Sequence, residues 1–196
     1  MRLVLATRNA HKVEELGALL AGHELAGLPA HLPSPEETGE TFAENALIKA
    51  RAAARALGVP AIADDSGVAS AALGGAPGVR SARFAGPDAT DAENLAKLLR
   101  EAPAGDPLAY VCVIAFVDPG NGEEWTVEGR CSGTLEAHPR GANGFGYDPA
   151  FLPDDVVDPD RPGRTMAELS PQEKAAISHR GRAAAALRER LRGRVR

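Results

Sequence analysis

The chain has 196 residues, a net charge of −5 and 44% hydrophobic residues, which suits one large domain, or one domain with two lobes, around its own core. The negative charge argues against a nucleic-acid-binding protein with a broad basic face. No apolar run approaches the length of a membrane-spanning helix, and residues 1–2 lead into the strand-like segment 3–6 without a signal-peptide pattern. We therefore expect a single domain over residues 1–196 in a cytoplasmic protein that binds neither membranes nor nucleic-acid polymers.

The chain opens with a buried strand at residues 3–6 and continues into a helix over residues 10–20 with one apolar face. Asn9 is a suitable N-cap for this helix. Lys12 then falls in the first helical turn, where its charge opposes the helix dipole. An anion at the helix N-terminus, where free N–H groups bind phosphate, would explain this lysine; the alternative is a solvent-facing side chain.

Residues 22–40 are interrupted by proline and glycine, with a possible short strand at 25–28 and an acidic run that composition alone assigns to a solvated face. Thr41 and Glu44 form a capping-box pattern that starts the next helix, and Gly58 stops it. Lys49 lies on the edge of its apolar stripe, from which it can project toward a site.

A short apolar strand at residues 61–63 delivers two adjacent carboxylates, Asp64 and Asp65, followed by Ser66 and the glycine-rich loop 74–78. Carboxylates at the end of a buried strand are costly unless a metal, a partner or a catalytic role compensates them. Together with hydroxyl, bare backbone and nearby arginines, they indicate a site for a metal-bound anion, most plausibly phosphate. The alternative is an ordinary turn at the exit of a strand.

Residues 91–100 form a short amphipathic helix, and the apolar run 108–117 predicts a central strand. A turn at 118–122 joins this strand to an alternating strand over 125–131, so the two form an antiparallel hairpin. Alternating helices and strands with such a hairpin predict an α/β fold with a mixed sheet. Cys112 and Cys131 lie in separate apolar segments, and we expect both to be reduced core residues.

Two later segments carry possible binding residues. The glycine-rich loop 141–149 places Phe145 and Tyr147 where they can stack on a flat ring or, alternatively, fill the core. Ser170 begins a helix that carries Lys174 in its first turns and His179 two turns later. Taken alone, this histidine is more typical of a hydrogen-bonded structural residue than of a catalytic base.

Taken together, the segments resemble the inosine triphosphate pyrophosphatase family, whose members hydrolyse deaminated purine nucleoside triphosphates. Each motif is weak alone, but they follow the family's order over nearly the whole chain and are highly specific as a set. Arg8 and His11 stand where glycine is common in the family, so the loop that holds them is expected to act rather than their side chains. The matching segments are TRNAHK at 7–12, EETG at 36–39, residues 42–50, ADDSG at 63–67, residues 73–83, GFGYDP at 144–149 and residues 170–180.

The resemblance implies an α/β fold with an elongated mixed β-sheet flanked by helices and two lobes around a central active-site cleft. It also implies a homodimer that requires Mg²⁺. The implied reaction hydrolyses purine nucleoside triphosphates, namely dITP, ITP and XTP, to the monophosphate plus pyrophosphate, which keeps these nucleotides out of DNA and RNA.

The resemblance also implies roles by position. Asp65 would be the catalytic proton acceptor, and Glu37 and Asp65 would bind Mg²⁺. The implied substrate-binding residues are Thr7, Arg8, Asn9, Ala10, His11, Lys12, Lys49, Ser66, Phe145, Gly146, Tyr147, Asp148, Lys174, His179 and Arg180.

The residue chemistry agrees with this assignment. Cleavage between the α- and β-phosphates needs a water aimed at the α-phosphorus and neutralised charge on the leaving pyrophosphate. Carboxylates, lysines and a hard, oxygen-liganded ion supply both. Donors near His179 and Arg180 would satisfy the 6-oxo group of hypoxanthine and leave adenine badly paired. Two alternatives are a Mg²⁺-dependent phosphatase that releases orthophosphate and a nucleotide-binding module without turnover.

Overall fold

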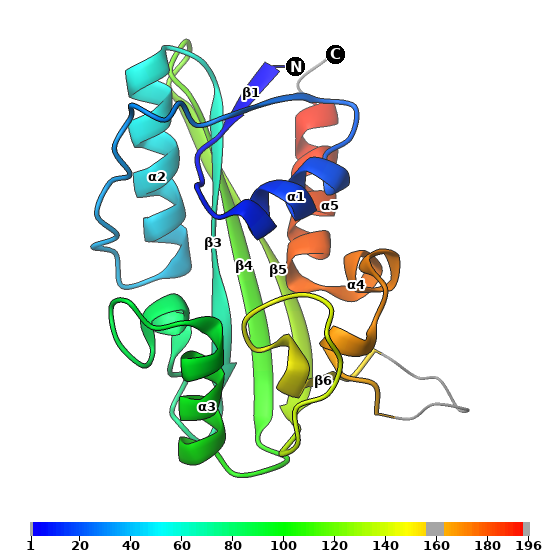
Figure 1. Cartoon of the computed structure of the whole chain (residues 1–196). Helices are drawn as coiled ribbons and strands as arrows, with labels where there is room; N and C mark the ends of the chain where they lie inside the picture. The colour runs from blue at the N-terminus through cyan, green and yellow to red at the C-terminus, as the bar shows by residue number, and fades with distance from the viewer. Residues whose placement is uncertain (1, 156–162, 194–196) are drawn as a thin grey trace. The chain divides into compact units, whose positions relative to one another are not determined.

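The computed structural model describes residues 2–155 and 163–193 (Figure 1). Within these residues, six strands form one sheet in the order β2-β1-β3-β4-β5-β6. The strands are β1 (Arg2–Leu5), β2 (Glu24–Gly27), β3 (Ala61–Ser70), β4 (Pro107–Asp118), β5 (Glu123–Leu135) and β6 (Phe151–Pro153). β1 is parallel to β2 and β3, whereas β5 and β6 are antiparallel, so the predicted mixed sheet is confirmed.

Three helices begin directly after the capping residues that the sequence predicted. The helices are α1 (Ala10–Leu19), α2 (Phe42–Leu57), α3 (Asp91–Glu101), α4 (Pro171–Ile177) and α5 (His179–Arg192), with short 3₁₀ helices at Gly78–Arg83, Asp148–Ala150 and Met166–Glu168. Asn9 caps α1 by accepting the Lys12 N–H, and Thr41 and Ser170 close the capping boxes of α2 and α4. Gly58 ends α2 in the left-handed conformation, with φ of 67°, which only glycine adopts at little cost. Within the described residues, no helix combines the length and apolar character needed to cross a membrane.

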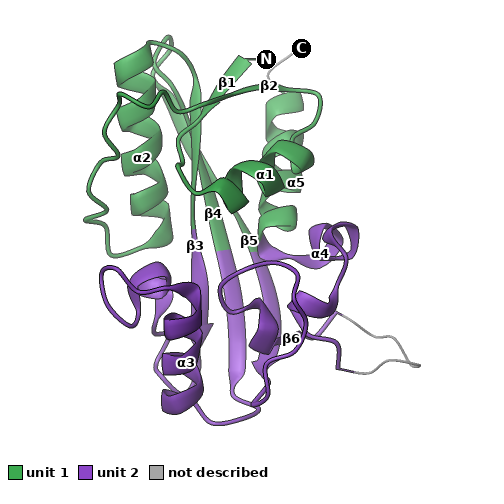
Figure 2. Ribbon diagram, viewed as in Figure 1, with its two compact units in different colours: residues 1–65, 112–129, 180–196 green, residues 66–111, 130–179 purple. Residues whose placement is uncertain are grey.

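The chain separates into two compact units, one of residues 1–65, 112–129 and 180–196 and the other of residues 66–111 and 130–179 (Figure 2). The prediction of one domain over residues 1–196 therefore stays a prediction. Each unit has its own hydrophobic core. The first is built around Leu3, Leu16, Ile62, Phe116 and Leu187, and the second around Val68, Leu98, Tyr110, Phe151 and Met166.

Two boundaries differ from the sequence prediction. β3 does not end before Asp64 but continues to Ser70, because the aspartates are paired with cations and the strand can keep them buried. The helix expected to run from Ser170 past His179 is broken at Ser178, whose φ of −67° and ψ of 155° are extended rather than helical. As a result, α4 ends at Ile177 and α5 starts at His179.

Candidate active site

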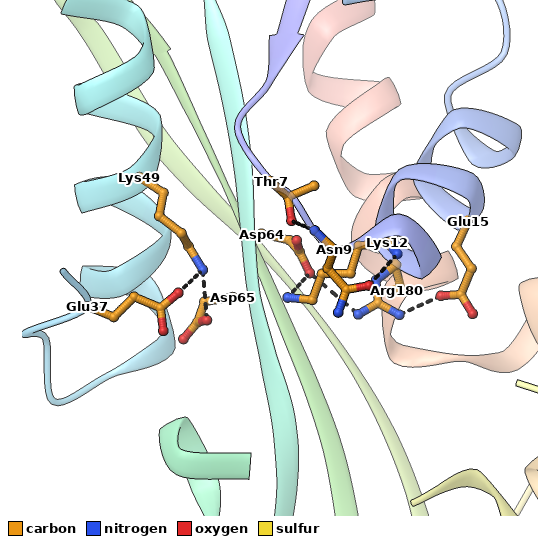
Figure 3. Close-up of polar contacts among 9 residues, drawn as sticks. All are labelled: Thr7, Asn9, Lys12, Glu15, Glu37, Lys49, Asp64, Asp65 and Arg180. Atoms are coloured by element: carbon orange, nitrogen blue, oxygen red, sulfur yellow. Dashed lines mark hydrogen bonds and ion pairs between the residues drawn. The ribbon is translucent and has the colours of Figure 1, made fainter. Parts of the chain in front are cut away.

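The site of the first unit is organised by the position of two aspartates within one strand. Successive side chains of a β-strand point to opposite faces of the sheet. Asp64 and Asp65 are neighbours in β3, and Figure 3 shows that Asp65 points toward α2 whereas Asp64 points toward α1 and α5. A single Asp-Asp pair therefore serves two separate polar clusters.

The first cluster joins Glu37, Lys49 and Asp65 (Figure 3). The Lys49 ammonium donates to Glu37 Oε1 at 2.7 Å and to Asp65 Oδ1 at 2.9 Å. The Lys49 side chain is only 12% exposed and that of Asp65 9%, so this ion pair is shielded from water. The lysine that sequence reasoning placed beside the acidic strand thus contacts both predicted metal ligands.

Burial decides the protonation behaviour of this cluster. Burial raises the pKa of Asp65 above its ordinary value, and the nearby charge of Lys49 offsets only part of that rise. For Lys49, burial acts to lower the pKa, but the charges of Asp65 and Asp64 and the hydrogen bond to Glu37 outweigh it, so the pKa is raised. Asp65 is therefore a carboxylate with an increased affinity for a proton beside a firmly charged ammonium, as a general base requires.

The segment that carries Glu37 is held in place by α2. Asn45 is fully buried, and its side-chain oxygen accepts the Gly39 N–H at 2.8 Å while its amide donates to the Gly39 carbonyl at 3.2 Å. This paired contact fixes the backbone two residues after Glu37. The Asn45 side chain therefore positions the loop that carries Glu37.

The second cluster surrounds Asp64, whose side chain is 0% exposed. Lys12 Nζ lies 2.9 Å from Asp64 Oδ2, and Arg180 Nη2 lies 3.4 Å from the same oxygen. Burial alone would raise the pKa of Asp64, but the charges of Lys12 and Arg180 hold it well below its usual range. The anion that explains Lys12 in the first turn of α1 is therefore, in this structure, the Asp64 carboxylate.

The Arg180 guanidinium binds two carboxylates of the protein. It is only 2% exposed, and its Nη1 donates to Glu15 Oε2 at 2.5 Å in addition to the Asp64 contact. The neighbouring carboxylates raise its pKa further despite its burial. Sequence reasoning missed Glu15, which has no motif around it and contacts Arg180 only because α1 and α5 meet in this unit.

The loop between β1 and α1 is largely exposed, and hydrogen bonds of Thr7 and Arg8 hold its first residues in place. Thr7 Oγ1 accepts the Asn9 N–H at 3.3 Å, while Ala10 and His11 are exposed. The Arg8 guanidinium donates to Ser34 Oγ and to the carbonyls of residues 29, 30 and 32. Its side chain thus anchors the segment that leads to Glu37. The prediction that the loop rather than this side chain meets substrate stays a prediction.

The second unit carries the other predicted residues around Asp148, which is 2% exposed. Asp148 Oδ2 accepts Lys174 Nζ at 2.7 Å and the Phe145 N–H at 2.9 Å, and Oδ1 accepts the Tyr110 hydroxyl at 3.0 Å. Gly144 has a φ of 73°, and a Cβ there would overlap Asp148 Oδ2. Glycine is therefore required for the loop to wrap around this carboxylate.

The remaining loop residues divide into half-buried and buried positions. Phe145 is half-buried, with the Lys174 ammonium 5.0 Å from its ring centre. The Gly146 N–H donates to Asp91 Oδ2 at 3.0 Å, and the buried Tyr147 hydroxyl donates to the Ser81 carbonyl at 2.7 Å. Ser66 is half-buried in β3 directly after Asp65. Tyr147 therefore fills the core, which was one of its two predicted roles, whereas Phe145 keeps an accessible surface.

Sequence reasoning also missed Tyr110. Its ring stacks on His179 with centroids 4.5 Å apart and an interplanar angle of 9°. One signal could have drawn attention to it: a phenol in the apolar run 108–117 must find a hydrogen-bond partner when buried.

The Glu37 and Asp65 pair fits a magnesium ion. Mg²⁺ is usually held by one or two carboxylates, with waters and substrate phosphates completing its shell. The two carboxylates already converge on one cation, the Lys49 ammonium, and the buried Asp65 Oδ2 has no hydrogen-bond partner among the described residues. Across residues 2–155 and 163–193, no group of three or more His, Cys, Asp or Glu side chains is placed to hold a metal, so a closed cage of protein ligands does not fit.

Known proteins with related sequences and structures cover nearly all of the chain. The model of the Ham1 family matches residues 3–190. A dITP/XTP pyrophosphatase of Streptomyces avermitilis is 50% identical over 194 residues, which are 93% of this chain and 92% of that protein. Another dITP/XTP pyrophosphatase, from Geobacillus kaustophilus, is 50% identical over 196 residues, or 95% and 92% of the two chains. The solved structure of a HAM1 protein from Coxiella burnetii has a TM-score of 0.84 and 44% identity, and covers 98% of this chain and 99% of that chain.

Proposed function

Because this chain belongs to the Ham1 family, we propose that it hydrolyses the deaminated purine nucleotides dITP, ITP and XTP to their monophosphates and pyrophosphate. In the cell this activity would keep deaminated purines out of DNA and RNA. The observation that carries the proposal is the 50% identity, over nearly the full length of both chains, to proteins named dITP/XTP pyrophosphatase. The cluster of the buried Asp65 with the half-buried Lys49 and Glu37 supports the same type of reaction.

Asp65 would act as the proton acceptor. A water oxygen attacks the α-phosphorus, the water gives one proton to the Asp65 carboxylate, and the bond to the α–β bridging oxygen breaks to release pyrophosphate. Burial, which raises the pKa of Asp65, increases its affinity for that proton. The Lys49 hydrogen bond holds Oδ1 in place, and this leaves Oδ2 available for the water or for a metal ion.

Glu37 and Asp65 would hold Mg²⁺, which, when bound, would neutralise phosphate charge and favour ionisation of a water. The chain's own contribution is to bring the two carboxylates to one place. Asn45 does this for Glu37 through the Gly39 backbone, and β3 does it for Asp65.

The lysines would balance the charge that develops on the leaving pyrophosphate. Lys12 and Lys49 lie in the first unit, in the first turn of α1 and beside Asp65 respectively. Each ammonium can share its charge between a carboxylate and a phosphate because it carries three donors. Lys174, in the second unit, pairs with Asp148 in the same manner.

The base would be recognised by residues of the second unit. Phe145 offers a half-buried aromatic face for stacking, which does not distinguish one purine from another. His179 would donate to the 6-oxo group, which adenine lacks. Arg180 belongs to the first unit and is held by two carboxylates, so its contribution would be to keep the start of α5 in position.

Two further properties belong to the proposal. The resemblance supports a homodimer, which light scattering coupled to size-exclusion chromatography would measure. A cytoplasmic location is supported by Cys112 and Cys131, which are both buried and outside any disulfide, as expected in a reducing compartment.

A substrate panel with product identification tests the proposal. The protein is incubated with dITP, ITP, XTP, ATP and GTP, with Mg²⁺ or with EDTA, and phosphate is measured before and after addition of inorganic pyrophosphatase. Phosphate that appears only after that addition, together with the monophosphate, establishes pyrophosphate release. Direct release of orthophosphate supports the phosphatase alternative, and binding without either product supports a non-catalytic module.

A further inference from the structure

Tyr110 is a buried polar residue that the proposed reaction does not use. It lies in β4, in the second unit, and is 6% exposed. Its hydroxyl donates to Asp148 Oδ1 at 3.0 Å. Its ring stacks on His179, with centroids 4.5 Å apart, and also contacts Phe151, with centroids 4.4 Å apart at an interplanar angle of 31°. One side chain therefore touches both the loop that carries Phe145 and the residue at the start of α5.

The hydrogen bond and the stacked ring of Tyr110 hold two different groups in place. The hydrogen bond fixes the Asp148 carboxylate, whose other oxygen holds Lys174 and the Phe145 backbone. The tyrosine ring lies at 9° to the plane of the His179 imidazole and is stacked on it, so packing opposes rotation of that imidazole. A donor that reads one group on a base must be held to within about 0.5 Å and 10–20° of its productive geometry. His179 lies directly after the break at Ser178, so its helix restrains it on one side only.

We propose that Tyr110 is a positioning residue for base discrimination, because its ring sets the plane of His179 while its hydroxyl sets the Asp148–Lys174 pair. The inference rests on the proposed function in one respect, namely that His179 reads the base. The inference assigns a different effect on kcat/KM to the ring of Tyr110 and to its hydroxyl. Loss of the ring affects the choice of base, and loss of the hydroxyl affects all bases equally.

The two contacts can be removed one at a time. Tyr110→Phe keeps the ring and removes the hydrogen bond, so kcat/KM for ITP and for ATP should fall by the same factor and their ratio should stay within about threefold of wild type. Tyr110→Leu removes the ring, so the ratio should fall by about tenfold or more, the size expected when a supporting residue is lost. His179→Gln should change the ratio in the same direction.

A matched control comes from the same strand. Phe116 is fully buried in β4, in the first unit, and stacks on Trp125 with centroids 4.7 Å apart. Phe116→Leu removes an aromatic stack from a core without touching His179. It should lower the unfolding midpoint as Tyr110→Leu does and leave the ITP-to-ATP ratio unchanged.

A second measurement does not depend on turnover. In the NMR spectrum, the Tyr110 ring shields the His179 ring protons, so their resonances should move downfield in Tyr110→Leu and stay near the wild-type position in Tyr110→Phe. The His179→Gln variant identifies these resonances among those of the five histidines. If wild type releases no pyrophosphate from ITP, the proposed function fails, and this measurement alone decides whether Tyr110 positions His179.

Three outcomes would overturn the inference. One is an unmoved His179 resonance in Tyr110→Leu. Another is a ratio that stays within about twofold of wild type in Tyr110→Leu while His179→Gln lowers it. The third applies even where Tyr110→Leu does not fold: a Tyr110→Phe variant whose ratio falls as far as that of His179→Gln would show that the hydroxyl, and not the ring, governs the choice of base.

Discussion

Replacement of Asp64 by asparagine should mainly lower the stability of the fold, whereas the same replacement at the adjacent Asp65 should mainly lower turnover. Asp64 has a fully buried side chain and compensates two cations, Lys12 and Arg180. Asp65 contacts Lys49, which has a second carboxylate partner in Glu37. We therefore expect Asp64→Asn to damage the fold and Asp65→Asn to stop the reaction.

The loss of unfolding free energy expected for Asp64→Asn follows from the burial of Arg180. Without the Asp64 charge, this 2% exposed guanidinium loses a fully buried counter-charge, and the side chain of Glu15, which remains in contact with it, is 26% exposed. Removal of one partner from a buried ion pair costs about 3–5 kcal/mol, out of a typical stability of about 5–15 kcal/mol. With a urea dependence of about 2 kcal/mol per molar, the unfolding midpoint should fall by about 1.5–2.5 M.

Asp65→Asn should change the urea midpoint of unfolding much less than Asp64→Asn does. Its pKa is raised because burial disfavours the charged form, so a neutral amide removes that cost and still offers an oxygen to Lys49. We expect a change of about 1 kcal/mol or less, the size of one hydrogen bond. Turnover should fall by far more than tenfold, because the proton acceptor is gone.

Urea unfolding and pyrophosphate release decide between these expectations. Trp125, the chain's only tryptophan, lies in the core of the first unit and reports its unfolding by fluorescence. The reasoning is refuted if Asp64→Asn keeps the wild-type midpoint, since the buried network would then not carry the stability assigned to it. Asp65 is not the general base if Asp65→Asn retains more than about a tenth of wild-type turnover, which is a barrier change of only about 1.4 kcal/mol.

Further predictions concern three side chains. Lys174→Met should lower both the unfolding midpoint and kcat/KM, because the buried Asp148 keeps only uncharged donors; an unchanged midpoint would show that the pair is not shielded. Arg8→Gly should speed hydrogen exchange in residues 29–34 while it leaves global stability within about 0.5 kcal/mol, and unaltered exchange would contradict the clamp. Cys112, whose pKa burial raises to about 12, should resist iodoacetamide at pH 8 in the native protein and react after unfolding, as mass spectrometry would show.

The sequence by itself determined the local structure and the family. Capping residues such as Asn9, Thr41 and Ser170 act over three or four residues, so their signals were complete in the chain and each helix starts where they indicated. The turn after β4 likewise predicted the hairpin. The order of the short motifs, rather than any one of them, indicated the pyrophosphatase resemblance, which agrees with the relatives found.

Tertiary structure decided which charges meet. Lysines 12, 49 and 174 were predicted as binding residues from the sequence, but their carboxylate partners are distant in the chain. The partner of Lys12 is 52 residues away, those of Lys49 are 16 and 12 residues away, and that of Lys174 is 26 residues away. The opposite directions of Asp64 and Asp65 follow from the pleat of β3, and sequence reasoning lost them because it ended that strand too early. Glu15 and Tyr110 carry no motif, since their roles arise from packing between distant segments. Local signals fix where an element begins, but only the assembled sheet determines which side chains it brings together.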